Sequence, residues 1–159
     1  MSHVEMKKVE SQNLDALERA AASLGGELIR GQKTHAWWGS WVGDWTVDRS
    51  AVAQGRDPKT FGKCDHAIRI AGRPGVNGRS GPWEVGVVKD GDGFLLLYDN
   101  YGNAGRELER LFGASMESLA NQYGAEVAAE TLIEQGYQVW IESTPDGPNV
   151  HAESDMELY

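Results

Sequence analysis

The residues best suited to bind another molecule are tryptophans crowded into one short segment. Four of the six tryptophans fall within nine positions, and they are Trp37, Trp38, Trp41 and Trp45. If this segment is a strand, Trp37, Trp41 and Trp45 lie on one face, and Gly39 and Gly43 leave gaps between their rings. Such gaps can receive a base, a sugar or a protein side chain. Aromatic residues are enriched at protein interfaces, so we expect exposed rings that contact a partner protein; the alternative is that the rings cover a sheet face that helices do not reach.

A second candidate is the glycine-rich loop 73–81, which carries two guanidinium groups. Arg73 and Arg79, together with backbone N–H groups, could hold a phosphate and therefore a small anionic ligand such as a nucleotide. The loop lacks the lysine of a P-loop and the glycine pattern of a dinucleotide site. A mobile loop without a ligand is the alternative.

The run Cys64-Asp65-His66 offers a nucleophile or metal ligands. In a strand, Cys64 and His66 share the side that also holds Ile68 and Ile70, which favours a place in the core. A reactive thiolate needs a base and an electropositive setting, and no other ligand-type residue stands at diagnostic metal spacing. We therefore expect no metal and no other cofactor.

Two aspartates give an acid–base hypothesis. Asp65 and Asp99 both lie on predicted strands or strand ends, and a carboxylate pair can do acid–base work when its surroundings separate the two pKa values. His66 would complete the site if the three side chains share a cleft. A bond within a turn or between strands is the alternative for each aspartate. We also expect Asp99 and Tyr101, at the end of a buried strand, to be binding residues.

Apolar spacing and turn residues predict the elements that position these groups. Strands are expected at 4–9, 27–30, 64–70, 83–88, 94–98, 137–142 and 149–153, and helices at 13–24, 106–112 and 116–135. Ser11 or Asn13 should cap the first helix and Ser115 the last. The run 94–98 places apolar groups on both faces, as in a central strand covered from both sides. This order predicts an α+β domain, with a mostly antiparallel sheet and two or three helices packed on one face.

The stretch 31–82 is punctuated by glycine and proline and shows little periodicity. It is too long for a plain connection within a compact domain, so part of it must be strand or a functional insertion. We expect a single domain over 1–159, with a Trp/Gly-rich and basic insertion at about 31–82.

Charge is divided unevenly along the chain. Residues 1–80 carry 12 Lys and Arg against 9 Asp and Glu, whereas residues 81–159 carry 3 against 15. The acidic half repels phosphates, so a nucleic acid partner is not expected. No stretch approaches the roughly 20 apolar residues of a membrane span, and the N-terminus has no signal-peptide run. With a single cysteine, these features indicate a cytoplasmic protein without an internal disulfide or a membrane partner.

Several segments, taken in order, resemble a known but uncharacterised family. They are Met1-Ser2-His3, Lys63–Arg69, Trp83–Gly91, Phe94–Gly102, Gln122-Tyr123 and Gly136–Val139. The set is similar to the hypothetical chloroplast open reading frame 35 proteins (domain of unknown function 1257), which occur in plastids, cyanobacteria, other bacteria and phages. Val4 stands where the family has a bulky aromatic residue, and the Trp-rich segment and the loop 49–79 look like additions. The resemblance implies the fold and a bacterial or phage source, but no activity.

These observations favour a small non-enzymatic binding or adaptor module that contacts another macromolecule through the Trp-rich segment. The alternative is a binder, or a hydrolase, of a small anionic ligand such as a nucleotide. The predicted binding residues are Trp37, Trp38, Trp41, Trp45, Arg73, Arg79, Asp99 and Tyr101.

Overall fold

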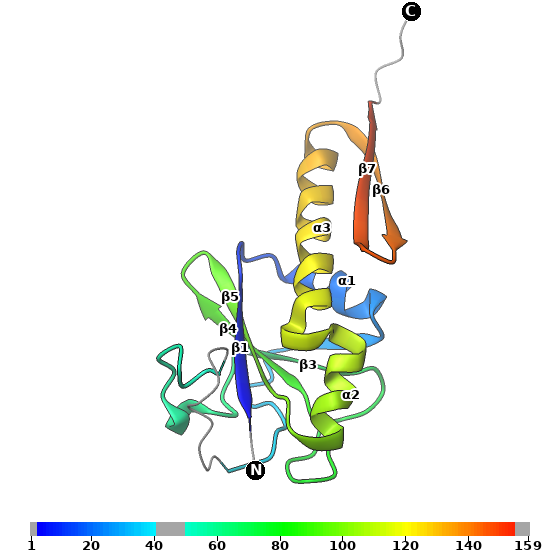
Figure 1. Cartoon of the computed structure of the whole chain (residues 1–159). Helices are drawn as coiled ribbons and strands as arrows, with labels where there is room; N and C mark the ends of the chain where they lie inside the picture. The colour runs from blue at the N-terminus through cyan, green and yellow to red at the C-terminus, as the bar shows by residue number, and fades with distance from the viewer. Residues whose placement is uncertain (1–2, 41–49, 155–159) are drawn as a thin grey trace, which may run out of the picture.

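A five-stranded antiparallel sheet occupies the centre of the structure, a computed structural model that describes residues 3–40 and 50–154. Its strands are β1 (Val4–Val9), β2 (Gly26–Arg30), β3 (His66–Ile70), β4 (Val85–Asp90) and β5 (Gly93–Asp99). They lie in the order β1-β5-β4-β3-β2, and all neighbours are antiparallel (Figure 1). The predicted α+β class with a mostly antiparallel sheet is confirmed.

Helices pack on one face of this sheet. They are α1 (Leu14–Ser23), α2 (Gly102–Phe112) and α3 (Glu117–Glu134). Their apolar side chains meet the sheet in a core that includes Leu17, Leu108 and Leu119, none of which is exposed. All residues of β5 are buried, because they alternate between this core and the opposite face. The prediction of a central strand covered from both sides is confirmed.

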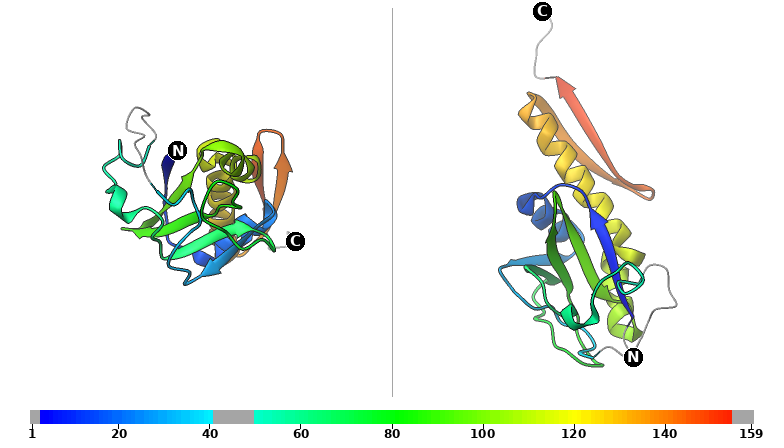
Figure 2. Two further views of the ribbon diagram at one scale, coloured as in Figure 1. Left: turned by 90° about the horizontal axis from the view of Figure 1, so that it is seen from below. Right: turned by 90° about the vertical axis from the view of Figure 1, so that its left-hand side faces the viewer.

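The opposite face of the sheet is covered by the irregular segments 31–40 and 50–65 (Figure 2). The side chains that pack together there are Trp37, Ala51 and Phe61 from the segments, and Val4 and Leu97 from the sheet. The contact is close, since a Cβ added to Gly86 of β4 would lie 2.4 Å from Cδ2 of His35. The predicted insertion therefore completes the core wherever the structure describes it, and it contains the expected strand β3.

The helix ends show which local signals decide the structure. Asn13 caps α1 as predicted, because its Oδ1 accepts the N–H of Ala16 at 2.9 Å. Ser115 is predicted to cap α3, but the N-cap position is Met116; Ser115 has φ 55° and Met116 has φ 60°, which forms a tight turn before the helix. The prediction is wrong because the Ser115 N–H donates to the hydroxyl of Tyr98 at 2.9 Å, which holds the turn against β5.

The last two strands leave the central sheet. β6 (Tyr137–Thr144) and β7 (Gly147–Ser154) form a separate two-stranded sheet that packs against α3. The C-terminal half of α3 and this hairpin extend beyond the end of the five-stranded sheet (Figures 1 and 2). Residues 149–153, predicted as an edge strand, lie at an edge of the small sheet and not of the central one. We call residues 124–154 the arm and the other described residues the body.

Candidate functional site

Trp37 belongs to the interior. Its side chain is 7% exposed, and its ring meets Phe61 edge-on with the centroids 5.8 Å apart. Gly62 makes room for the indole, since a Cβ there would lie 2.6 Å from Nε1. The Trp37 N–H donates to Oδ1 of Asn77 at 3.0 Å, and its carbonyl accepts the Gly78 N–H at 2.9 Å. The prediction that this ring stands out toward water is wrong; the ring covers the sheet, as the alternative had it.

Three predicted binding residues meet at one end of the sheet. Trp38 is half-buried, and its ring lies edge-on to Tyr101 and Trp83, with centroids at 5.6 and 6.4 Å. Asp99 is not exposed at all. Its Oδ1 accepts the N–H groups of His3 and Tyr101, both at 3.0 Å, and its Oδ2 accepts that of Trp38 at 3.2 Å. Burial raises the pKa of Asp99, and the three N–H groups oppose this rise. Because the carboxylate is buried and accepts bonds from His3, Trp38 and Tyr101, it is inaccessible to a ligand.

Tyr101 is the most exposed residue of this group, at 37%. Trp41 and Trp45, the other two predicted tryptophans, lie outside the described residues. Within its described residues, the Trp-rich segment covers the sheet, and the exposed ring beside it is that of Tyr101.

The basic loop 73–81 is held by its own backbone. Five of its N–H groups donate to acceptors inside the protein, and they belong to Gly75, Val76, Gly78, Arg73 and Gly81. The first of these acceptors is the buried carboxylate of Glu84, at 3.1 Å. Arg73 pairs with Glu107 of α2 at 3.0 Å, whereas Arg79 is exposed. A small anionic ligand at this loop stays a prediction, and the internal bonds reduce the number of N–H groups that could hold it.

Cys64 and His66 are buried, as predicted, although β3 begins at His66 and Cys64 lies before the strand. Burial raises the pKa of the Cys64 thiol to about 12, and its Sγ donates to the carbonyl of Gln32 at 3.2 Å. Nδ1 of His66 accepts the Gly31 N–H at 2.9 Å, and burial lowers the pKa of this imidazole. A neutral thiol is a poor nucleophile and a poor metal ligand. Among residues 3–40 and 50–154, no group of three or more His, Cys, Asp or Glu is placed to hold a metal ion.

The structure also separates the proposed acid–base residues. His66 lies on the helix-covered face of the sheet, whereas Asp99 lies on the face covered by the irregular segments. Oδ2 of Asp65 accepts the Lys89 N–H at 2.9 Å, and Lys89 pairs with Phe94. Phe94 and Asp99 are about 17 Å apart along β5, at about 3.4 Å per residue. The hypothesis of a shared cleft is therefore wrong.

A polar cluster that the sequence did not reveal joins β1, β5 and α2. The Tyr98 hydroxyl contacts the carboxylate of Glu5, lies 2.6 Å from Oε2 of Glu109 and accepts the Ser115 N–H. Burial raises the pKa of Tyr98, so the phenol keeps its proton. Glu5 and Tyr98 are 93 positions apart in the chain, which explains why no local pattern predicts the cluster. The cluster holds α2 and the turn before α3 to the strands β1 and β5 of the sheet.

Exposed apolar side chains gather on the arm. They are Ile133, Tyr137 and Trp140, with exposed fractions of 56%, 40% and 48%. Alternation along β6 explains the exposure of Trp140. Ile141 pairs with Val150, which lines a hollow against Gly124 of α3, so this side of the hairpin faces the helix. Trp140 points to the other side, where its ring stacks on His151 of β7 with the centroids 5.2 Å apart.

Charge on the arm is of one sign. Residues 124–154 contain six carboxylates and no lysine or arginine. Arg19 of α1 pairs with two of them, at 3.0 Å from Glu126 and 3.2 Å from Glu130. The remaining four are exposed, and they are Glu134, Glu142, Asp146 and Glu153. By strand register, Glu142 and Glu153 share the outer face of the hairpin with Trp140, so carboxylates flank an accessible indole.

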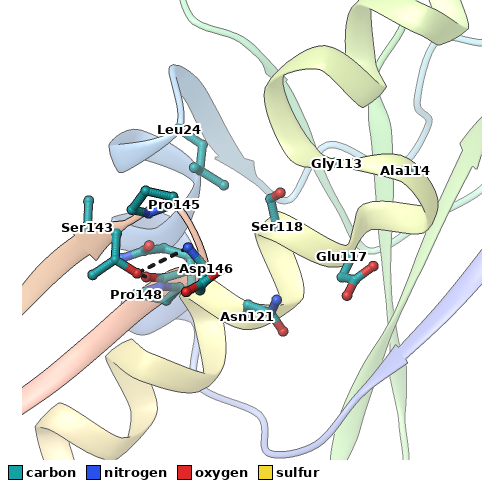
Figure 3. Close-up of a pocket in the computed structure, with 13 residues that line it drawn as sticks. Leu24, Gly113, Ala114, Glu117, Ser118, Asn121, Ser143, Pro145, Asp146 and Pro148 are labelled. Atoms are coloured by element: carbon teal, nitrogen blue, oxygen red, sulfur yellow. Dashed lines mark hydrogen bonds between the residues drawn. The ribbon is translucent and has the colours of Figure 1, made fainter.

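A polar pocket of about 390 Å³ separates the hairpin turn from the start of α3 (Figure 3). Its lining includes Leu24, Ser118, Asn121, Pro145 and Pro148. The turn is fixed by its own bonds, since Oγ1 of Thr144 donates to the Gly147 carbonyl at 2.6 Å and accepts the Asp146 N–H at 3.2 Å. The charged side chains in the lining are Glu117 and Asp146, so the described part of the chain offers an anionic ligand no cation here.

Comparisons of the chain with protein-family models, curated proteins and solved structures find no match. The resemblance to the hypothetical chloroplast open reading frame 35 family therefore stays a prediction. No helix within the described residues is both long enough and apolar enough to cross a membrane.

The exposed face of the arm is missing from the predicted binding residues, although the sequence contains two signals for it. In the predicted strand 137–142, Trp140 alternates with Val139 and Ile141, which places it on the face opposite to the apolar one. No lysine or arginine follows Arg110. Each signal is weak alone; the structure joins them by folding the acidic end of the chain into one projecting arm.

Proposed function

We propose that the protein is a non-enzymatic binding module that docks onto a partner protein through its arm. The observation that carries the proposal is the outer face of the β6–β7 hairpin, where Trp140 is 48% exposed between carboxylates. Tryptophan is among the residues that most often dominate binding energy at protein interfaces. Exposed apolar groups rimmed by polar ones mark such interfaces.

A basic protein surface is the partner that this face fits. A lysine or arginine placed over the Trp140 ring would gain a cation–π interaction. The same cation would lie near Glu142 and Glu153, which share that face. The six carboxylates of the arm repel phosphates, so they disfavour a nucleic acid as the partner.

The body presents the arm in a fixed orientation. The hydroxyl of Tyr123 in α3 donates to the Ser11 carbonyl at 2.6 Å and accepts the Asn13 N–H at 3.1 Å. With the ion pairs of Arg19, these bonds hold α3 to the start of α1. A surface that is already ordered loses less conformational entropy on binding.

The groups that the sequence offered for catalysis support a non-enzymatic role. Cys64 and His66 are buried with neutral side chains, and Asp99 is fully bonded by backbone N–H groups. Their positions serve the interior of the body. We propose the arm and not the Trp-rich segment as the docking surface, because Trp37 is buried and Trp140 is exposed.

The test identifies the partner by contact and then measures its affinity. A photo-crosslinking residue replaces Gln138, which shares the outer face with Trp140, in cells that make the protein; a second variant carries it in place of Val76, which is 56% exposed on the body. A protein captured from position 138 is purified and titrated with the intact chain. We expect Trp140→Ala to weaken binding at least about tenfold, as for a central interface residue. The matched variant Val76→Ala should bind as tightly as wild type.

Two results would overturn this proposal. One is capture of the same proteins from both positions. The other is an affinity for the purified partner that Trp140→Ala leaves unchanged. Circular dichroism of each variant checks that the fold is intact.

A further inference from the structure

We infer that the partner contributes an extended basic segment, which pairs with the free edge of β6 as a third strand of the small sheet. This inference rests on the proposed function and specifies how the arm would bind. The observation behind it is that backbone N–H and C=O groups at the outer edge of β6 point away from β7.

The hairpin pairs along the whole length of its two strands. Its register runs from Tyr137 opposite Ser154 to Thr144 opposite Gly147, and within the described residues the sheet has only these two strands. The helix α3 lies against one face of the hairpin, not along a strand edge. In an antiparallel pair, alternate residues point their N–H and C=O groups away from the partner strand. An outer edge of this kind is a template for another strand.

The edge of β6 is more receptive than that of β7. β6 spans eight residues without proline or lysine, and it is rich in β-branched and aromatic residues, which favour strands. β7 carries Pro148 near its start, and proline lacks the N–H that a ladder needs. Natural edges are commonly protected by lysine, proline or bulges. β6 contains neither lysine nor proline, which makes it the better acceptor for an added strand.

Charge selects the occupant of this edge. A second copy of the chain, pairing through the same edge, would bring a second Glu142 to the contact, and like charges at close range disfavour that pairing. A strand with lysine or arginine at alternate positions would place these side chains beside Trp140 and Glu142 on the outer face. Its intervening residues would face α3, beside the apolar side of the hairpin. The segment that fits is therefore extended, with alternating basic and apolar residues.

The experiment uses the intact protein and a peptide of about ten residues that alternates lysine and valine. A second peptide of the same sequence carries N-methyl groups on alternate residues, which removes one edge of N–H donors and keeps the charge. Hydrogen exchange is followed at residues 137–144, and affinity is measured by calorimetry. We expect the plain peptide to protect β6 amides about tenfold and to bind at least about tenfold more tightly than the methylated one. Glu142→Lys should weaken binding, whereas Glu10→Lys, a matched charge reversal on the body, should not.

Three outcomes separate this inference from the proposed function. If both peptides bind equally and β6 stays unprotected, strand addition is overturned, and docking through Trp140 is still judged by the crosslinked partner. If neither peptide protects β6 at millimolar concentration, the basic extended occupant is overturned. If β6 is protected without peptide and the protein has the mass of a dimer, the occupant is a second copy and the inference is wrong.

Discussion

Trp37 packs on the central sheet and Trp140 projects from the two-stranded sheet, yet the first ring is buried and the second is exposed. Around Trp37, the segments 31–40 and 50–65 fold back over the central sheet and bury its second face. Around Trp140, the two-stranded sheet has α3 on one side and no described segment on the other. The difference lies in how much chain is available to cover each sheet, not in the aromatic residues themselves.

This contrast also divides the roles of the two regions. The body uses aromatic rings and buried carboxylates to close its core, as Asp99 and Glu84 show by accepting backbone N–H groups. Within the arm, the hairpin needs α3 for its order, because an isolated hairpin is marginally stable in water. The outer face of the hairpin contributes little to the stability of the fold, so its side chains are available to bind a partner.

The largest expected effect comes from removing each ring in turn. Trp37→Ala should lower the free energy of unfolding by about 3–5 kcal/mol, since it leaves a cavity between Phe61 and the sheet. Trp140→Ala should lower it by less than about 1 kcal/mol, because nearly half of that side chain is already exposed. Urea denaturation of both variants measures the difference.

Equal losses for the two variants would contradict the contrast between a sealed and an open region. A large loss for Trp140→Ala alone would mean that the hairpin face is structural, and it would remove the reason to propose it as a docking surface.

A second effect, of about 2 kcal/mol, tests how tightly the body is sealed around His35. This imidazole is buried against Gly86, and burial lowers its pKa from the ordinary 6.5 to about 4. Between about pH 6.5 and about pH 4, His35 is therefore protonated in the unfolded chain and neutral in the folded one. Stability should fall as the pH falls through this window, by about 2 kcal/mol from about pH 7 to about pH 4.5.

His35→Gln provides the comparison, because glutamine does not titrate. The measurement is the free energy of unfolding of both proteins at the two pH values. The variant should lose about 2 kcal/mol less than wild type on acidification, whatever its stability at neutral pH. The same acid loss in both would show that His35 is not the buried titrating group.

Most of the body could be predicted because its signals are local. The apolar run 94–98 identifies a strand covered from both sides, and the cap of Asn13 and the stop at Gly25 delimit α1. The Ser115 cap failed because a contact with Tyr98, distant in sequence, outweighs a local preference. Helix and strand positions follow local periodicity, whereas the exact turn before α3 follows tertiary contacts.

The candidate site could not be predicted in the same way. The crowding of tryptophans in 37–45 describes their spacing in the sequence. The solvent exposure of each ring depends instead on which parts of the fold pack on it. Trp37 is buried by contacts with Phe61 and with the sheet, and no spacing rule encodes these. A single tryptophan such as Trp140 is no local signal for a binding site, and its exposure follows from the separation of the hairpin from the central sheet.

The smallest expected effect concerns the link between the two regions. Arg19 on α1 pairs with Glu126 at 3.0 Å and with Glu130 at 3.2 Å, but 44% of its side chain is exposed. Exposed ion pairs contribute about 0.2–1 kcal/mol, so Arg19→Gln should lower the free energy of unfolding by less than about 1 kcal/mol. At molar salt, where screening acts within about 3 Å, the loss should shrink further.

Hydrogen exchange shows whether this small energy acts on the arm. Arg19→Gln should speed exchange in β6 and β7 while β4 and β5 stay protected, because the pair joins α1 to α3 rather than to the central sheet. Arg30→Gln is the matched control, since Arg30 is 43% exposed and pairs with Asp15 at 2.6 Å within the body. Faster exchange of the hairpin in both variants would show that general loss of stability, and not the link through Arg19, loosens the arm. Unchanged exchange in Arg19→Gln would show that the ion pairs of Arg19 do not hold the arm in place. The contact of α1 with α3 and the bonds of Tyr123 to Ser11 and Asn13 would then do so.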